Sequence, residues 1–252
     1  MTTFKSEDAL RVWLINKISE SFPDNAILKG GMQLRLIDSP RYTNDIDYTF
    51  IPFDSKKEIL EPLVSFLSSL KEITEISYKM NSKCLRINII AGKLSCVIEV
   101  NVEKECPYDS ISSGSVARTL NLTGRVVKVM DFSYSMANKL AAWLERDLLR
   151  DLYDCYFFHT FLKITPDYER LKKRLSDIRF TKKNGRKKSM TLTEFSEIIK
   201  LKSETLTEKQ MDEMIGLLDK NELPGLHIKM KKALIQIADE IRELEENRVY
   251  PE

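Results

Sequence analysis

The chain carries Thr43-Asn44-Asp45-Ile46-Asp47-Tyr48-Thr49-Phe50, and this stretch decides the expected fold. Residues 46–51 are rich in β-branched and aromatic types, which predicts a strand. Side chains two residues apart on a strand share a face, so Asp45 and Asp47 point the same way. Like charges this close repel each other unless a cation lies between them, and ligands with oxygen atoms alone are typical of Mg²⁺ or Mn²⁺ sites. We therefore expect a divalent metal at this strand; the simpler alternative is a surface turn that precedes a strand.

A short apolar run, Ala26-Ile27-Leu28, precedes this strand and leads through Lys29 into a glycine pair, Gly30 and Gly31. Helical character resumes over residues 32–37. A strand that enters a glycine pair at the start of a helix leaves backbone N–H groups to meet phosphate oxygens, and the helix dipole helps. We expect Gly30 and Gly31 to bind the phosphates of a nucleotide beside the metal, although most glycine pairs mark only a turn.

A third carboxylate is needed if two metal ions are to be held for in-line phosphoryl transfer. Residues 94–103 read as a strand in which Glu99, Asn101 and Glu103 share one face. We expect Glu99 to be the third ligand, because it lies in the centre of the apolar run, where an unpaired charge is costly. Glu103 lies at the end of the run, beside Lys104, and fits a solvated position. The alternative for Glu99 is the ordinary polar face of an antiparallel strand.

Composition sets broad limits on what the chain can be. Its 252 residues are 42% hydrophobic and 31% charged, which is enough for two modest domains. The formal net charge of +2 argues against a general nucleic-acid coat protein. Four cysteines without a CxxC spacing and two histidines predict neither a zinc site nor a disulfide framework. The first residues lack a signal-peptide core, and no apolar stretch reaches the ~18 residues of a membrane span, so we expect a cytoplasmic protein with no membrane contact.

The order of elements predicts two domains. Helical periodicity extends over residues 6–22 and, after a capping pattern that starts at Ser55, through residue 70. Further strands are predicted at 73–80, 85–91 and 94–103, the last two joined by a hairpin. Segment 107–124 is rich in Gly, Pro, Ser and Thr and is expected to be a connector. We therefore expect a mixed α and β domain over 1–115 and a mainly helical domain over 116–252.

Helices dominate the second half of the sequence. One strand is expected over 125–130, followed by a strongly helical stretch over 132–161 that is interrupted near 146–150. Further helices are predicted at 167–178, 193–202, 207–220 and 226–245.

A basic segment lies between two of these helices. Residues 170–188 carry ten Lys or Arg against one acid, Asp177. Positive charge concentrated in this way favours contact with RNA phosphates, and a solvated surface loop is the alternative. The candidate nucleic-acid contacts are Lys182, Lys183, Arg186, Lys187 and Lys188.

A second informative block begins in the helix after residue 132 and ends in Arg150-Asp151-Leu152-Tyr153-Asp154. Lys139, Arg146 and Arg150 are spaced by seven and four residues, so an unbroken helix would place them near one face with reach toward triphosphate oxygens. Asp151 and Asp154 are three residues apart and would orient Lys139 or bind the attacking hydroxyl. The alternative is a ladder of surface salt bridges that contributes little to stability.

These motifs together resemble the AbiEii/AbiGii-type nucleotidyltransferase-like proteins, which are toxins of bacterial abortive-infection and toxin–antitoxin systems. That family shows, in order, a Gly-Gly or Gly-Ser turn, a D-[IL]-D strand, a K-L-x-A-L helix and a [KR]-D-x-x-D motif. Here these align with Gly30 and Gly31, Asp45 to Asp47, Lys139, and Arg150 to Asp154. Two departures are Trp143 in place of leucine, which stays apolar, and Met32 where a small hydroxyl residue is commoner. Met32 weakens the case for side-chain contacts to phosphate there.

The resemblance implies an α+β fold of the DNA polymerase β-like superfamily, with a mixed-sheet palm, flanking helices and a mainly helical C-terminal domain. It implies transfer of NMP from an NTP to an acceptor hydroxyl, with Mg²⁺ or Mn²⁺ held by Asp45, Asp47 and Glu99. RNA, including a tRNA 3′ end, is the implied acceptor, and an antitoxin is a possible partner. The implied catalytic residues add Lys139 and Asp151, and the implied nucleotide contacts are Gly30, Gly31, Lys139 and Arg146.

Two other functions fit the same residues. A nucleotidyltransferase with a small-molecule acceptor would not depend on the basic segment. A nucleotide-responsive interaction module without turnover would keep its biological effect after Asp45→Ala. We favour the RNA enzyme because Asp45, Asp47 and Glu99 are expected on matching strand faces, an arrangement that a module without turnover does not need.

Overall fold

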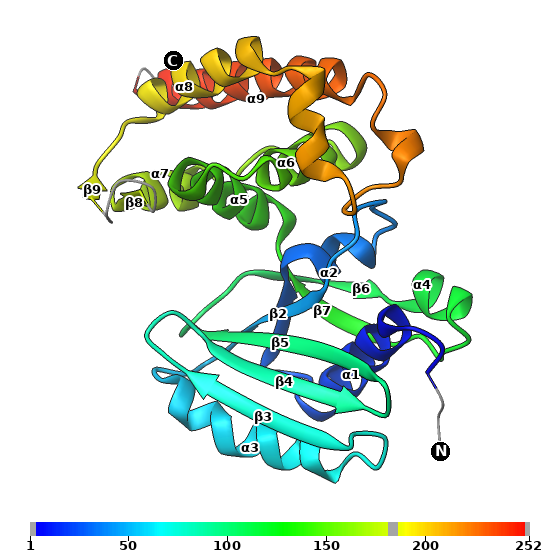
Figure 1. The fold of residues 1–252 in the computed structure, drawn as a ribbon. Coiled ribbons are helices and arrows are strands. Elements are labelled where there is room, and N and C mark those ends of the chain that lie inside the picture. Colours follow the sequence, from blue (N-terminus) through cyan, green and yellow to red (C-terminus); the bar gives the residue numbers. More distant parts are fainter. Residues whose placement is uncertain (1–3, 181–185, 250–252) are drawn as a thin grey trace. The chain divides into compact units, whose positions relative to one another are not determined.

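The computed structural model describes residues 4–180 and 186–249 (Figure 1). The chain divides into two compact units, Met1–Asp131 and Phe132–Glu252. The boundary therefore follows Asp131 and not residue 115 as expected from the sequence. The reason is strand β7 (Val126–Met130), whose hydrogen bonds join it to the sheet of the first unit.

The first unit is built on one mixed sheet with the strand order β3-β4-β5-β2-β1-β7-β6. Its strands are β1 Ala26–Lys29, β2 Asp45–Phe50, β3 Glu75–Met80, β4 Leu85–Ala91, β5 Leu94–Val102, β6 Tyr108–Ser112 and β7. The central strand, β2, pairs antiparallel with β1 and parallel with β5. The expected α+β fold and the predicted strand at the two aspartates are confirmed.

The helices that accompany the sheet over residues 4–131 are α1 Glu7–Ser21, α2 Gly30–Arg35, α3 Lys56–Ser69 and α4 Gly114–Thr119. The hydroxyls of Ser6 and Ser55 accept hydrogen bonds from the backbone N–H groups of Ala9 and Lys57, so the two predicted caps begin α1 and α3. Helices α1 and α3 cover the same face of the sheet (Figure 1).

The core of the first unit lies between that face and the two helices. Tyr48 and Phe50 of β2 are fully buried there. The ring of Phe22, at the end of α1, lies 5.6 Å from that of Phe50 and 5.5 Å from that of Phe66 on α3, both edge to face. Side chains alternate along a strand, so residues 45 and 47 point to the opposite face of the sheet.

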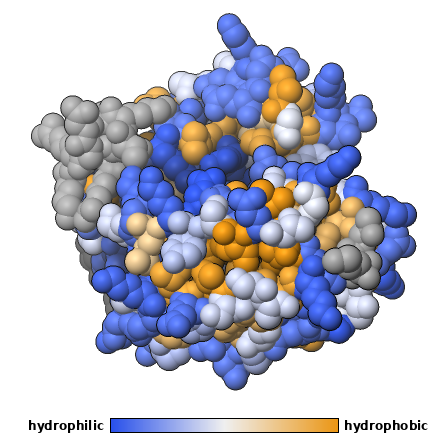
Figure 2. All heavy atoms as spheres, turned by 60° about the horizontal axis from the view of Figure 1, so that its bottom comes forward, coloured by the Kyte–Doolittle hydropathy of each residue, from blue (hydrophilic) through white to orange (hydrophobic). Residues whose placement is uncertain are grey.

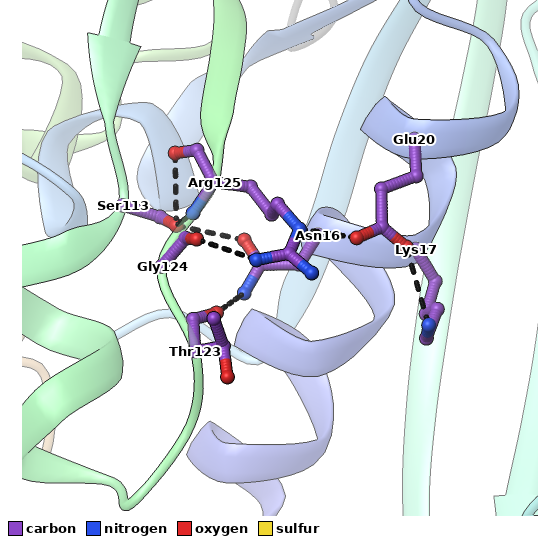
Figure 3. A network of polar contacts seen from close by, with 7 residues as sticks. All are labelled: Asn16, Lys17, Glu20, Ser113, Thr123, Gly124 and Arg125. Atoms are coloured by element: carbon purple, nitrogen blue, oxygen red, sulfur yellow. Dashed lines mark hydrogen bonds and ion pairs between the residues drawn. The ribbon is translucent and has the colours of Figure 1, made fainter.

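A partly buried polar network ties α1 to the segments on either side of α4 (Figure 3). The Asn16 amide donates to the Thr123 carbonyl at 2.9 Å and accepts from the Ser113 hydroxyl at 2.7 Å. The Arg125 N–H donates to the same hydroxyl at 2.9 Å, and the Arg125 guanidinium pairs with Glu20. The network fixes a loop that would otherwise carry unpaired backbone groups.

Asn16→Ala is expected to lower the free energy of unfolding by about 1 to 2 kcal/mol, because it removes the two hydrogen bonds that the amide forms with the Thr123 carbonyl and the Ser113 hydroxyl, while the hydroxyl keeps its contacts to the Arg125 backbone. Asn16 is 6% exposed. Urea unfolding of the whole chain measures the change. Lys17→Ala is the matched control: it removes an exposed ion pair with Glu20 on the same helix and should cost less than about 0.5 kcal/mol. Equal losses for the two variants would contradict this role.

The second unit is mainly helical, as predicted. Its α-helices within the described residues are α5 Phe132–Arg146, α6 Leu149–Leu162, α7 Tyr168–Leu175, α8 Leu192–Thr205 and α9 Leu226–Val249. The same residues also form a ribbon of β8 Ile178–Phe180 and β9 Arg186–Lys188, and the 3₁₀ helices η2 Glu208–Met214 and η3 Lys220–Glu222. The predicted interruption after residue 146 is present. Asp147 adopts a φ of 53° there and separates α5 from α6.

Two predicted segments differ from the structure. Segment 107–124 contains β6 and α4 and is no plain connector. Strand β6 lies at the sheet edge and is polar and largely exposed, so it lacks the apolar alternation that identifies a strand. Residues 207–220 hold the 3₁₀ helix η2 instead of a full α-helix, although the Thr207 capping box does form.

The surface combines hydrophilic and apolar areas, and one apolar area faces the viewer in Figure 2. Large apolar side chains that are exposed in the first unit are Tyr42, Tyr78, Tyr108 and Val126. Apolar atoms supply much of any folded surface, so such an area alone does not identify an interface. Among the residues that the structure describes, no helix is long and apolar enough to cross a membrane.

Candidate active site

Strand β2 presents two carboxylates on one face. Asp45 and Asp47 are half-buried, whereas Ile46 and Tyr48 between and after them are fully buried on the opposite face. The alternation expected from the sequence is thus present. The two carboxylates lie on the sheet face that α1 and α3 leave uncovered.

Glu99 lies beside them on the parallel neighbour, β5. Its Cα is registered with that of Asp47, so the two side chains project from the same face of adjacent strands. Glu99 Oε1 also lies 3.1 Å from Nη1 of Arg86 on β4, and the arginine side chain is 53% exposed. Because Arg86 is this exposed, its attraction for Glu99 is weakened by solvent.

Charged side chains on this face of the sheet affect the pKa of a neighbouring thiol, Cys84. Burial raises the pKa of Cys84, and the negative charges of Glu99 and Asp47 raise it further. Arg86 and Lys56 act in the opposite direction and lower this pKa, so both carboxylates and cations lie near the thiol.

The glycine turn lies directly against the carboxylates. Gly30 has a φ of 72°, and a Cβ at this residue would lie 2.2 Å from Oδ2 of Asp47. A Cβ on Gly31 would lie 2.6 Å from Oγ1 of Thr43. Both glycines are therefore required by the close packing of the turn against the aspartate strand, whether or not phosphate binds there.

The donor set fits a hard divalent cation in part. Asp45 and Asp47 supply oxygen ligands on one face, which suits Mg²⁺ or Mn²⁺. Glu99 is next to them but paired with Arg86. Within residues 4–180 and 186–249, no three acidic, His or Cys side chains are gathered closely enough to form a complete metal cluster. Two aspartates are thus the core of the candidate site, and Glu99 is the nearest addition.

The second unit brings together the residues of the second sequence block. Lys139 Nζ lies 2.6 Å from Oδ2 of Asp154 and 3.6 Å from Oδ1 of Asp151. Arg146 contacts Asp151 through two nitrogens, each at 2.7 Å. Both aspartate side chains are fully buried. The two carboxylates are therefore buried, whereas Lys139 and Arg146 are 18% and 40% exposed, so the alternative of a solvated surface ladder is wrong for the aspartates.

Arg150 does not join this cluster in the way that the spacing suggested. The helix breaks at Asp147, so Arg150 lies on α6 and not one turn beyond Arg146 on the same helix. Its side chain is exposed. The expected single face of three cations therefore does not form.

The basic segment divides into partnered and exposed residues. Arg170 and Arg174 of α7 bind Asn138 at 2.8 and 3.2 Å, and Arg174 pairs with Glu145 at 3.0 Å. Lys172, Lys173 and Lys188 are exposed. Of the other predicted contacts, Lys182 and Lys183 lie outside the described residues. Arg186 and Lys187 are placed in the backbone of β9, and their side chains also fall outside what the structure describes.

Sequence reasoning missed two residues next to the aspartates. The Thr43 hydroxyl donates to Oδ1 of Asp45 at 2.8 Å, and the buried Arg41 lies beside Gly31. The hydroxyl two residues before a carboxylate was a usable signal, because Ser and Thr often bond to groups a few residues away. The position of Arg41 depends on how the loop folds back onto α2.

Comparison with known proteins agrees with this fold. MenT4, a nucleotidyltransferase toxin from Mycobacterium tuberculosis, aligns with a TM-score of 0.59 at 15% identity, over 92% of this chain and 82% of that chain. JHP933 from Helicobacter pylori aligns with a TM-score of 0.55 at 15% identity, over 96% and 97% of the two chains. At such low identity these likenesses bear on the fold alone. A search among curated proteins gives no match.

The family comparison goes further than the fold. Residues 14–237 match the family described as nucleotidyl transferase AbiEii toxin, type IV TA system. This match spans both units and contains the aspartate strand, the glycine turn and the buried cluster. The chain therefore belongs to the AbiEii family of nucleotidyltransferase toxins and is a nucleotidyltransferase.

Proposed function

We propose that this nucleotidyltransferase is metal-dependent and transfers NMP from an NTP to a hydroxyl group of RNA, with tRNA as the favoured acceptor. Asp45 and Asp47 hold Mg²⁺ or Mn²⁺, and Glu99 assists them. The observation that carries the proposal is the acidic face formed by β2 and β5, in which Glu99 is registered with Asp47 and Gly30 leaves room for the Asp47 carboxylate.

The chemistry requires the acceptor oxygen to form a bond to the α-phosphorus while the bond from that phosphorus to the bridging oxygen breaks, so that pyrophosphate leaves. A bound divalent cation would offset negative charge on the phosphates. Asp45 and Asp47 would hold that cation. Glu99 would share it or accept the proton of the acceptor hydroxyl, after Arg86 has moved away. Gly30 and Gly31 would offer backbone N–H groups to β- and γ-phosphate oxygens.

Lys139 and Asp151 remain proposed catalytic residues of the second unit, on the ground of their match to the family motifs. Arg146 remains a proposed nucleotide contact on the same ground. Its two-point ion pair with Asp151 means that a nucleotide would have to share or displace that carboxylate.

The test is incubation of the purified chain with each of four α-labelled NTPs, Mg²⁺ or Mn²⁺ and total bacterial RNA. The control is the variant Asp45→Ala with Asp47→Ala. Label that enters RNA with the unaltered chain alone is the expected result, and it also gives the base preference. Transfer that persists in the variant, or that does not need a divalent cation, would overturn the metal site. Label that enters a small molecule instead would replace the RNA acceptor.

The exposed lysines of α7 support the RNA acceptor and provide a separate prediction. Lys172→Glu with Lys173→Glu should reduce the slope of log affinity for RNA against log salt by about one to two, because phosphate contacts release bound counterions. The matched control is Lys229→Glu with Lys232→Glu, which changes two exposed lysines of α9 by the same charge. RNA affinity that falls equally in both variants would show a general charge effect and remove this support.

We also propose that the chain acts as the toxin of a toxin–antitoxin pair, or in abortive infection, and that an antitoxin restrains it. The support is the family description. Induced expression in a bacterial host should arrest growth, and the double aspartate variant should not. Arrest by both proteins at equal levels would separate toxicity from nucleotidyl transfer.

A further inference from the structure

The segment between α2 and β2 holds one of the two aspartates by a specific hydrogen bond. Thr43 lies two residues before Asp45, and its Oγ1 donates to Oδ1 of Asp45 at 2.8 Å. A hydrogen bond at this distance limits rotation of the carboxylate about its Cβ–Cγ bond. The second carboxylate oxygen of Asp45, Oδ2, does not take part in this hydrogen bond. Its direction is nevertheless fixed, because the whole carboxylate is held through Oδ1.

Thr43 is itself fixed by Gly31. A Cβ on Gly31 would lie 2.6 Å from both Cβ and Oγ1 of Thr43, far closer than any real contact. Gly31 does not have a positive φ, unlike Gly30, so backbone conformation does not explain this glycine. A glycine is needed here because the Thr43 side chain packs directly against the backbone at the start of α2 and leaves no room for a Cβ on residue 31. The β-branched side chain has few rotamers, and this contact restricts them further.

Arg41 also packs against Gly31, beside the Thr43 side chain. Its side chain is almost completely buried, and Nη2 would lie 3.0 Å from a Cβ on Gly31. Its Nη1 donates to the Tyr42 carbonyl at 3.2 Å, and its backbone N–H donates to the buried Ser39 hydroxyl at 3.4 Å. These contacts hold the loop that carries Thr43, so the hydroxyl is presented to Asp45 by a fixed segment.

We propose that Thr43 is a positioning residue for the metal ligand Asp45, and that Gly31, by lacking a side chain, leaves the space in which the Thr43 side chain packs. The proposal rests on the proposed function in one respect, namely that Asp45 binds a divalent cation. It explains why residue 31 has no side chain, and it leaves the backbone N–H of Gly31 available for the proposed phosphate contact. A partner that orients a metal ligand typically contributes 10- to 100-fold in metal affinity, and we expect about tenfold here.

Two variants of Thr43 separate the hydroxyl from the shape of the side chain. Thr43→Val keeps the branched shape and loses the donor, whereas Thr43→Ser keeps the donor. Mn²⁺ binding to the whole chain without nucleotide, followed by the electron paramagnetic resonance of free Mn²⁺, is measured for both. Thr43→Val should raise the dissociation constant about tenfold, and Thr43→Ser should stay within about twofold of the unaltered chain. The midpoint of thermal unfolding is recorded beside each.

The Mg²⁺ dependence of transfer gives a second measurement. Thr43→Val should raise the half-saturating Mg²⁺ concentration by a similar factor, with a smaller change in kcat at saturating Mg²⁺. A merely structural residue would lower the unfolding midpoint and kcat without this shift. If Gly31 acts through Thr43, Gly31→Ala should weaken Mn²⁺ binding, and its effect should not add to that of Thr43→Val.

Each outcome decides the proposal. Equal Mn²⁺ affinity of Thr43→Val and the unaltered chain overturns it, and so does a chain that binds no Mn²⁺ at all. A chain that transfers no label to any acceptor but binds Mn²⁺ more weakly after Thr43→Val would contradict the proposed function and support the role of Thr43. A chain that transfers label, and whose Mg²⁺ requirement is unchanged by Thr43→Val, would support the proposed function and contradict the role of Thr43.

Discussion

Asp47→Asn is expected to lower the rate of NMP transfer by at least about 1,000-fold. The amide keeps the size of the side chain but loses the negative charge that holds the cation, and a bound metal contributes several kcal/mol of charge stabilisation in such reactions. Asp47 is the best placed of the three acids, because it adjoins Gly30 and is registered with Glu99. Single-turnover transfer at saturating NTP measures the effect.

The control for this result is Asp54→Asn in the same unit. Asp54 is 74% exposed and forms a surface ion pair with Lys104 at 3.1 Å, so its loss should leave the rate within about twofold. Both variants should show the same midpoint of thermal unfolding as the unaltered chain. Activity of Asp47→Asn above about a tenth of the unaltered rate would exclude Asp47 as a metal ligand.

Asp154→Leu is expected to lower the free energy of unfolding by about 3 to 5 kcal/mol. The substitution removes the 2.6 Å contact of Lys139, which is 18% exposed, and leaves Asp151 at 3.6 Å as the remaining carboxylate of the cluster, one that Arg146 also binds; breaking a buried ion pair on one side is strongly destabilising. Denaturant unfolding measures the loss. Asp239→Ala on α9 is the comparison, because its ion pair with Lys200 involves a side chain that is 50% exposed and should contribute less than about 1 kcal/mol.

A double variant tests whether charge or packing causes this loss. Asp154→Leu with Lys139→Met removes both partners and leaves Asp151 with its two-point contact to Arg146. It should be more stable than Asp154→Leu alone, because apolar replacement of a buried pair is often neutral. A double variant that is less stable than the single one would show that the pair acts through packing.

Local patterns in the sequence were enough to predict the parts of the site that depend on one strand or one turn. The alternation in β2 placed Asp45 and Asp47 on one face, and the isolated acid in the apolar run identified Glu99. Helix starts at Ser6 and Ser55 followed from capping chemistry. In each case the deciding interactions lie within a few residues of the chain.

Features that depend on distant residues could not be predicted in the same way. The Arg86 partner of Glu99 comes from the register of β4 against β5. The strand β6 was missed because a polar edge strand is recognised by its pairing with β7 and not by its own pattern. The single face of Lys139, Arg146 and Arg150 required an unbroken helix, and the predicted interruption, which lies at Asp147, prevents it. Tertiary pairing decides the first two of these features.

The parallel pairing of β2 with β5 also bears on how the protein is made. Parallel neighbours cannot be joined by a tight turn, and here α3, β3 and β4 intervene between them. A chain leaving the ribosome therefore carries Asp45 and Asp47 well before Leu94–Val102 can align beside them. The acidic face is completed late in synthesis, and a nascent or truncated chain that ends before β5 holds both aspartates without the strand that puts Glu99 next to them.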